Sequence, residues 1–263
     1  MSKDSSKLTI DKPRGEGQTL PWSPWIAVVF VVVVYFVSQF VSGLLVSIYP
    51  ALHHWSLVQA NDWLNNNVLA QFLYVLIAES LTFGGIYAFM RARKVSLKAI
   101  GLRRPRWSDA LYGLGMLPLY YLSYIVLVAI ATQIAPSLNI NQQQQIGFSG
   151  AHGVALLIVT FISLVILPPL VEEIMMRGFL YTSLKKGLPK VGAALVTSVI
   201  FASAHLQAGS GAPLLWIAAI DTFTLSLFLV YLREKTDGLW ASMTLHALKN
   251  GIAFISLFIL HLS

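Results

Sequence analysis

The chain has 263 residues, of which 56% are hydrophobic and only 11% charged, with a mean hydropathy of +0.70 and a formal net charge of +7. A soluble domain carries about 25% charged residues, so the composition excludes an ordinary soluble globular protein. Several apolar runs reach the roughly 20 residues that a helix needs to cross a hydrocarbon core of about 30 Å. The sequence therefore predicts an all-α protein, a polytopic transmembrane helical bundle in the lipid bilayer.

Hydrophobic periodicity and length predict about seven spans. In chain order we expect them over residues 25–49, 67–90, 110–135, 153–185, 190–206, 212–232 and 239–262. The fourth is too long for one simple crossing, and Pro168-Pro169 predicts a kink within it. The fifth is short. The chain contains no cysteine, which excludes disulfides and thiolate metal sites.

Lys and Arg residues occur in alternate connections between the predicted spans. The N-terminal tail and the connections after the second, fourth and sixth spans carry them, whereas residues 50–66, 136–152 and 207–211 contain none. Because positively charged loops stay in the cytoplasm, we expect a multi-pass cell-membrane protein with its N-terminus in the cytoplasm and its C-terminus outside. The net charge then reflects topology and contact with anionic lipids, and we expect no nucleic-acid partner.

Three short motifs place ionisable residues inside the predicted spans. They are Glu172-Glu173 with Arg177, Phe201 with His205, and His246 with Asn250. A charged side chain within a bilayer costs roughly 2.5–3.5 kcal/mol, so such residues seldom persist there without a function. At about 1.5 Å of rise per residue from the cytoplasmic ends, Glu173, His205 and Asn250 each lie roughly 20 Å along their helices. We therefore expect the three motifs to meet at one level of the membrane.

Helical spacing predicts which of these side chains are neighbours. Glu173 and Arg177 are separated by four residues and can pair on one helix face. Glu172 is turned about 100° away from Glu173, so it is free to face a different partner. His246 and Asn250 also share one face. Two carboxylates, two imidazoles and a carboxamide are groups that can activate a water molecule and hold an oxyanion.

The three motifs resemble those of the CPBP family of intramembrane proteases, which includes the CAAX prenyl endopeptidases and bacterial bacteriocin-processing or immunity-type Abi proteins. The family pattern is EExxxR, then FxxxH, then HxxxN or HxxxD, and residues 155–255 contain it in this order. The resemblance implies a glutamate-dependent endopeptidase that cleaves a membrane-associated protein or peptide near the cytoplasmic face. The resemblance implies a catalytic core over residues 151–263, while the charge and hydrophobicity of the chain predict a cytoplasmic tail over 1–24 and transmembrane helices over 25–150.

The resemblance also assigns roles to the motif residues. It implies that Glu172 and His205 activate water and that His246 and Asn250 stabilise the oxyanion. Glu173 and Arg177 are expected to be supporting residues. We expect no cofactor. The alternative is a zinc-dependent protease in which Glu172, His205 and His246 bind the metal, although the sequence has no HExxH motif.

Two further alternatives use other features of the chain. Gly147-Phe148-Ser149-Gly150 matches the short GxSG pattern of rhomboid-type serine proteases, but it lies in an uncharged connection that we expect to be far from the histidines. A transporter or a non-catalytic scaffold would also bury ionisable residues, yet the chain has no internal repeat of the kind that transporters often show. The roles of Glu79 and Asp221 stay open, and Lys249 is expected to line a cavity or reach towards the interface without a catalytic role. The sequence predicts no oligomeric state.

Overall fold

The computed structural model describes residues 20–142, 147–148, 150–207 and 213–261, and all regular elements in these residues are helical. The all-α prediction is confirmed; most of the predicted N-terminal tail, up to residue 19, lies outside the described residues. The elements are α1 (Pro24–Leu52), α2 (Leu57–Asn66), α3 (Val68–Ala92), η1 (Leu97–Ile100), α4 (Trp107–Ile134), α5 (Val154–Phe161), η2 (Ile162–Ile166), α6 (Leu167–Glu173), η3 (Ile174–Leu180), α7 (Tyr181–Leu184), α8 (Lys190–Ser203), α9 (Trp216–Thr236), α10 (Trp240–Phe254) and η4 (Ile255–Ile259).

Six helices of the described chain are long and apolar enough to cross a membrane. The predicted fifth span is the exception, because α8 has 14 residues and is therefore about 21 Å long, short of a hydrocarbon core of about 30 Å. The seven predicted spans are thus six candidate spans and one shorter apolar helix. Helix α2 was not predicted. It lies within the uncharged connection over residues 50–66, and Ser56 and Gln59 form a capping box at its start.

The fourth span is one continuous helix of 31 residues, Val154–Leu184, which contains α5, η2, α6, η3 and α7. Pro168-Pro169 does not end this helix. Instead, the turn before the prolines, η2, is π-helical, and a second π-helical segment, η3, follows α6. A π-helical turn absorbs the backbone bonds that proline cannot make, and such turns are frequent at functional sites. The predicted kink therefore takes the form of widened turns.

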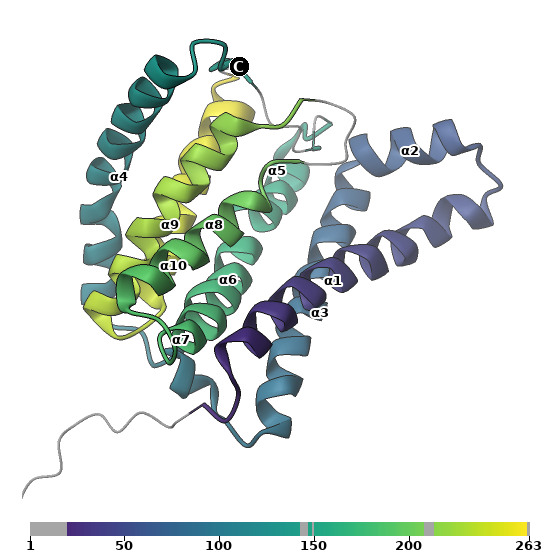
Figure 1. Cartoon of the computed structure of the whole chain (residues 1–263). Coiled ribbons are helices and arrows are strands. Elements are labelled where there is room, and N and C mark those ends of the chain that lie inside the picture. The colour runs from purple at the N-terminus through teal and green to yellow at the C-terminus, as the bar shows by residue number, and fades with distance from the viewer. Residues whose placement is uncertain (1–19, 143–146, 149, 208–212, 262–263) are drawn as a thin grey trace, which may run out of the picture.

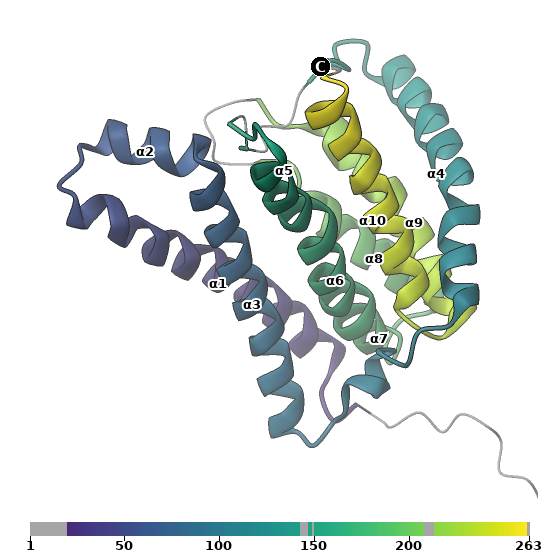
Figure 2. The same ribbon diagram turned by 180° about the vertical axis from the view of Figure 1, so that it is seen from behind.

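The helices form two groups. We call α1, α2 and α3 the arm, and α4 to α10 the bundle. Within the bundle α4 packs against α9 and α10, and α8 packs against α9. Figures 1 and 2 show the arm diverging from the bundle towards the end at which the chain terminates. The division at residue 150 stays a prediction, since α4 precedes this boundary and packs against helices that follow it.

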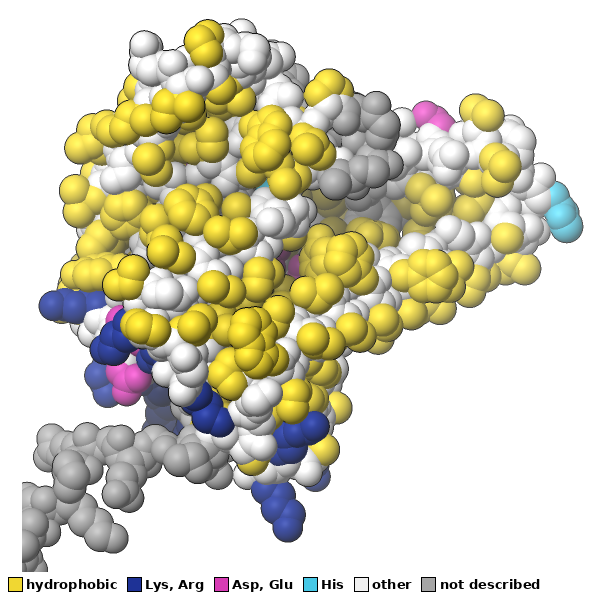
Figure 3. Space-filling view, in the orientation of Figure 1, with side chains coloured by type: hydrophobic (Ala, Val, Ile, Leu, Met, Phe, Trp, Pro, Cys, Tyr) yellow, Lys and Arg dark blue, Asp and Glu magenta, His cyan; other side chains and the backbone are white. Residues whose placement is uncertain are grey.

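The arm is attached to the bundle by an aromatic core near the start of α1. The Trp22 ring stacks on Phe179 of η3 at 5.3 Å between centroids, and Phe89 of α3 meets the same Phe179 ring edge-on at 5.3 Å. The Trp22 indole donates a hydrogen bond to Ser183 Oγ at 2.8 Å. Lys and Arg side chains gather at this end of the molecule (Figure 3). The basic end of the arm is therefore fixed to the bundle by packing.

The alternation of charged connections predicts which end of the bundle faces the cytoplasm. Lys235, beside the basic end, and Ser137, in an uncharged connection, are both exposed, so each can be replaced by a single cysteine. We expect an impermeant thiol reagent to label Ser137→Cys in intact cells and to label Lys235→Cys only after permeabilisation, because positive loops stay inside. The native chain has no cysteine to add background. Labelling of Lys235→Cys in intact cells would reverse the assigned topology.

Candidate active site

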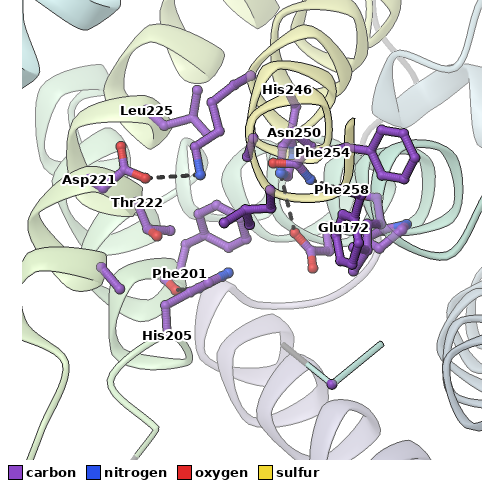
Figure 4. Close-up of a pocket in the computed structure, with 17 residues that line it drawn as sticks. Glu172, Phe201, His205, Asp221, Thr222, Leu225, His246, Asn250, Phe254 and Phe258 are labelled. Atoms are coloured by element: carbon purple, nitrogen blue, oxygen red, sulfur yellow. Dashed lines mark hydrogen bonds and ion pairs between the residues drawn. The ribbon is translucent and has the colours of Figure 1, made fainter. Parts of the chain in front are cut away.

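The three motifs meet on the wall of one cavity of about 560 Å³ inside the bundle, which we call the first cavity. Glu172 reaches it from α6, Phe201 from α8 and His205 from the turn after α8, while His246 and Asn250 reach it from α10 (Figure 4). The described structure therefore brings together the four residues that the sequence analysis selected as catalytic candidates. The helix counts predicted this convergence in depth, and the cavity adds that the side chains share one space.

A second cavity of about 490 Å³ lies between the arm and the bundle. Its lining includes Tyr35 of α1, Glu79 of α3 and Met176 of η3. Glu172, Phe201 and His205 line both cavities, so they stand where the two spaces meet. In Figure 3 acidic atoms are visible in a hollow between the arm and the bundle. The carboxylate and the imidazole can therefore be approached from two sides.

Behind the first cavity, Glu173 and Arg177 form a fully buried ion pair. Glu173 Oε1 accepts a hydrogen bond from Arg177 Nη1 at 2.9 Å, and both side chains have no exposed surface. The pairing predicted from their spacing is thus found. The Arg177 guanidinium also lies over the Phe201 ring, 4.4 Å from its centroid. Neither Glu173 nor Arg177 lines a cavity in the described structure, which agrees with a supporting role.

Glu173 also determines the state of His246. The same Oε1 lies 3.1 Å from His246 Nδ1, and because an ionised carboxylate only accepts, Nδ1 carries a proton and donates. His246 Nε2 then faces Glu172, at 3.8 Å from its Oε2. His246 can donate from Nε2 to an oxyanion only when both ring nitrogens are protonated. The two neighbouring carboxylates compensate the positive charge of that imidazolium.

His205 has the complementary arrangement. Its Nδ1 lies 2.9 Å from the carbonyl oxygen of Phe201, one helical turn earlier. A carbonyl oxygen only accepts, so Nδ1 of the neutral ring carries the proton and Nε2 is left as an acceptor. This is the form that can take a proton from water. The Phe201 ring meets both imidazoles edge-on, at 4.9 Å from His205 and 5.9 Å from His246, so the phenylalanine of the motif holds the two rings in place.

Asn250 is oriented by a backbone group that the two prolines leave unpaired. In a helix, the Leu164 carbonyl would accept from the N–H four residues later, at Pro168, or five residues later, at Pro169, and neither proline has an N–H. Asn250 Nδ2 donates to this carbonyl at 2.9 Å. One amide hydrogen is used there, and the other is left for a ligand. The prolines predicted only a kink. Their spacing of four and five residues after Leu164 is the signal in the sequence that predicts the free carbonyl.

The proposed zinc ligands do not come together as a set. Among the residues that the structure describes, no three His, Asp or Glu side chains gather closely enough to hold one metal ion. Glu172 and His246 are neighbours, whereas His205, although its Nε2 is an acceptor, does not join them closely enough to complete a ligand set in the described residues. The described side chains therefore do not fit a three-ligand zinc centre in this arrangement.

The structure also places the ionisable residues whose roles the sequence left open. Asp221 and Lys249 both line the first cavity and form an ion pair, with 2.9 Å between Lys249 Nζ and Asp221 Oδ2. Lys249 is therefore a cavity-lining residue, as expected. Glu79 faces the second cavity together with Glu172.

Part of the GxSG segment borders the same site. Gly147 lines the first cavity, and Phe148 is buried beneath the start of the fourth span, in a cluster with Val68 and Ala151. Gly147 therefore borders the same cavity as the two histidines, although the helix counts placed this segment far from them. Ser149 itself lies outside the described residues.

The buried ion pair predicts a stability phenotype for Arg177. We expect Arg177→Ala to lower the unfolding free energy by roughly 3–5 kcal/mol, because Glu173 would keep a buried charge with no guanidinium beside it. Adding Glu173→Gln should restore part of this loss, since the amide oxygen can still accept from His246. Thermal unfolding of the purified variants measures both effects, with the exposed Arg104→Ala as the matched control. An Arg177→Ala protein as stable as the wild type would contradict the structural role.

Comparison with known protein families supports the motif-based resemblance. Residues 154–252 match the family described as type II CAAX prenyl endopeptidase, Rce1-like, and the matched stretch contains all three motifs. Neither the curated proteins nor the solved structures contain a match to the chain. The predicted similarity to the CPBP proteases is thereby confirmed for residues 154–252, which resemble the CAAX protease family.

Proposed function

We propose that the protein is an intramembrane endopeptidase that hydrolyses a peptide bond of a membrane-associated protein or peptide without a metal ion. The observation that carries this proposal is that two hydrogen-bond acceptors, the Glu172 carboxylate and the His205 imidazole, line one cavity. Glu172 Oε2 is buried and has no hydrogen-bond partner among the described residues, and His205 Nε2 is left as an acceptor. Both groups can therefore accept from a water molecule held between them.

The first step activates that water. Glu172 and His205 each accept a hydrogen bond from the water. The water oxygen attacks the carbonyl carbon of the scissile bond, and one of its protons passes to one of these two bases. The same proton is later delivered to the nitrogen of the leaving amine, so the bases return to their starting state when the C–N bond breaks. General acid–base assistance of this kind contributes typically 10²- to 10⁴-fold to a rate.

The second requirement is a site for the negative charge that develops on the carbonyl oxygen. Asn250 retains one amide hydrogen for it, since the other is bound to the Leu164 carbonyl. His246 supplies a second donor from Nε2 as an imidazolium, with its Nδ1 proton held by Glu173. Donors held rigidly in a cavity with little water stabilise an oxyanion more strongly than donors in bulk solvent.

A zinc-dependent mechanism with the same residues is the alternative that the assay must separate. It would require Glu172, His205 and His246 to come closer together than they do in the described structure. Metal content of the purified protein, and activity before and after chelation, distinguish the two mechanisms. We expect full activity after chelation. Loss of activity that added zinc restores would establish the metal route.

The side of the membrane on which cleavage occurs follows from the predicted topology. We propose cleavage near the cytoplasmic face, because the helix counts start from basic connections. The first cavity continues past Asn250 to Leu257 and Phe258, which lie in η4, beyond the C-terminal end of α10. The cysteine-labelling experiment on Lys235 and Ser137 determines which end is cytoplasmic.

The catalytic assignment predicts the behaviour of three variants. We expect Glu172→Gln, His205→Ala and His246→Ala each to abolish proteolysis while the protein still inserts and purifies, because each removes a group that contacts the water or the oxyanion. Comparative mass spectrometry of cells with the wild type and with Glu172→Gln should reveal a membrane-associated precursor that accumulates only in the variant. The same precursor then serves as substrate for the purified enzymes.

Asp62→Asn is the matched control for loss of a carboxylate, since Asp62 lies in α2, outside both cavities, and accepts a hydrogen bond from Asn66. It should process the precursor like the wild type. A Glu172→Gln protein that retains full activity would remove Glu172 from the mechanism and favour a non-catalytic scaffold.

The free Leu164 carbonyl predicts an effect of Pro168 on catalysis. We expect Pro168→Ala to lower kcat at least tenfold, because the new N–H competes with Asn250 for Leu164 and a misplaced catalytic group costs up to about 10²-fold. Thermal stability should stay equal or rise, since alanine is the better helix former. Combined with Asn250→Ala, Pro168→Ala should add no further loss. Pro189→Ala, at the start of α8, is the control; additive losses in the double variant would contradict the coupling.

A further inference from the structure

The ion pair of Lys249 and Asp221 is a charged feature of the first cavity that the proposed chemistry does not use. Lys249 comes from α10 and Asp221 from α9, and the Tyr120 hydroxyl of α4 donates to Asp221 Oδ1. Both residues line the first cavity, and Figure 4 shows Asp221 on the same cavity as Glu172, His205 and Asn250. Lys249 follows His246 by three residues and precedes Asn250, so all three share one face of α10.

Comparison with the other buried pair shows what distinguishes this one. The side chains of Glu173 and Arg177 have no exposed surface, whereas those of Lys249 and Asp221 are 24% and 18% exposed. The Lys249 ammonium has three N–H donors, and Asp221 is its one acceptor among the described residues. Two donors are therefore left for a ligand in the cavity. When Lys249 also binds a ligand, Asp221 still accepts a hydrogen bond from the Tyr120 hydroxyl.

The two cavities differ in the charges that line them. Lys249 lies on the wall of the first cavity, whereas the second is lined by Glu79 and Glu172 and, within the described chain, by no Lys or Arg. The first cavity is also lined by the carboxylates of Glu172 and Asp221, but of the two cavities it is the one whose described lining offers a carboxylate a cationic side chain. A peptide bound at Glu172 and His205 has one side of its scissile bond in each cavity. This constrains the direction in which the peptide chain runs through the site.

We propose that Lys249 is a specificity residue that binds a carboxylate of the substrate, on the flank of the scissile bond that occupies the first cavity. This inference rests on the proposed function and identifies a chemical feature of the substrate. Lys249 is one helical turn from His246, so the carboxylate belongs to a residue close to the bond that is cleaved. The group is either the C-terminal carboxylate of a chain that ends nearby or an Asp or Glu side chain.

A binding experiment tests the inference without relying on hydrolysis. The probe is an N-palmitoylated octapeptide of alanine and leucine in three forms: with a free C-terminal carboxylate, with a C-terminal carboxamide, and as the carboxamide with one internal Glu. Each form is titrated against the Glu172→Gln protein in nanodiscs, labelled through a cysteine introduced at Lys235. We expect at least one carboxylate form to bind roughly 10- to 100-fold more tightly than the plain carboxamide.

The matched variant is Lys249→Gln combined with Asp221→Asn, which keeps the size and a hydrogen bond of the pair but removes both charges. Lys249→Gln alone would strand Asp221, so the double variant separates anion binding from folding. We expect the preference for the carboxylate to fall to about onefold in the double variant, and Lys249→Arg to retain part of it. Lys98→Gln, at the exposed basic end, should keep the full preference.

Each outcome has a distinct meaning. Tighter binding of the C-terminal carboxylate assigns the site to a chain end, and tighter binding of the internal Glu form assigns it to an acidic side chain. Equal binding of all three forms, or a preference that survives in the double variant, overturns the inference. A carboxylate preference without any precursor cleavage by the wild type would uphold the anion site while refuting the proposed protease activity.

Discussion

The site depends on one buried interaction, the contact of the Glu173 carboxylate with both Arg177 and His246. Three ionisable groups inside a membrane protein are costly unless each charge is compensated within the protein. Arg177 neutralises Glu173, and Glu173 in turn holds the Nδ1 proton of His246. The orientation of His246, and with it the direction of its Nε2, therefore follows from the need to satisfy a carboxylate that never faces the cavity.

A second constraint acts through the backbone. The prolines at 168 and 169 deprive the Leu164 carbonyl of both helical donors, and a buried carbonyl without a partner is unfavourable. Asn250 satisfies it, which joins the fourth span to α10 at the level of the site. The ion pair positions His246, and the free carbonyl positions Asn250, the two residues of the HxxxN motif. Helix α10 is thus held by two side chains four residues apart, while their remaining donors face the cavity.

The division of space around Glu172 gives the site its asymmetry. The first cavity contains the pair of Lys249 and Asp221, and the second, between the arm and the bundle, contains the carboxylate of Glu79. The arm is held to the bundle near its basic end by the ring contacts around Phe179 and along α3 by packing against α5 and α6, whereas α2 lies away from the bundle. The region before residue 150 thus shapes one wall of the site, although the family match does not extend to it.

The sequence by itself determined the membrane class, the helical spans and the seven motif residues, because hydrophobic length and i,i+4 spacing are local properties of a helix. It also predicted the pairing of Glu173 with Arg177 on that basis. It predicted that the fifth span is short, but not α2, the acceptor state of His205 or the bond from Asn250 to Leu164. Only the tertiary structure decided that Lys249 pairs with Asp221 and that Glu79 faces the second cavity. These contacts join helices that are distant in the chain. The periodicity of side chains within one helix does not predict which faces of such helices meet.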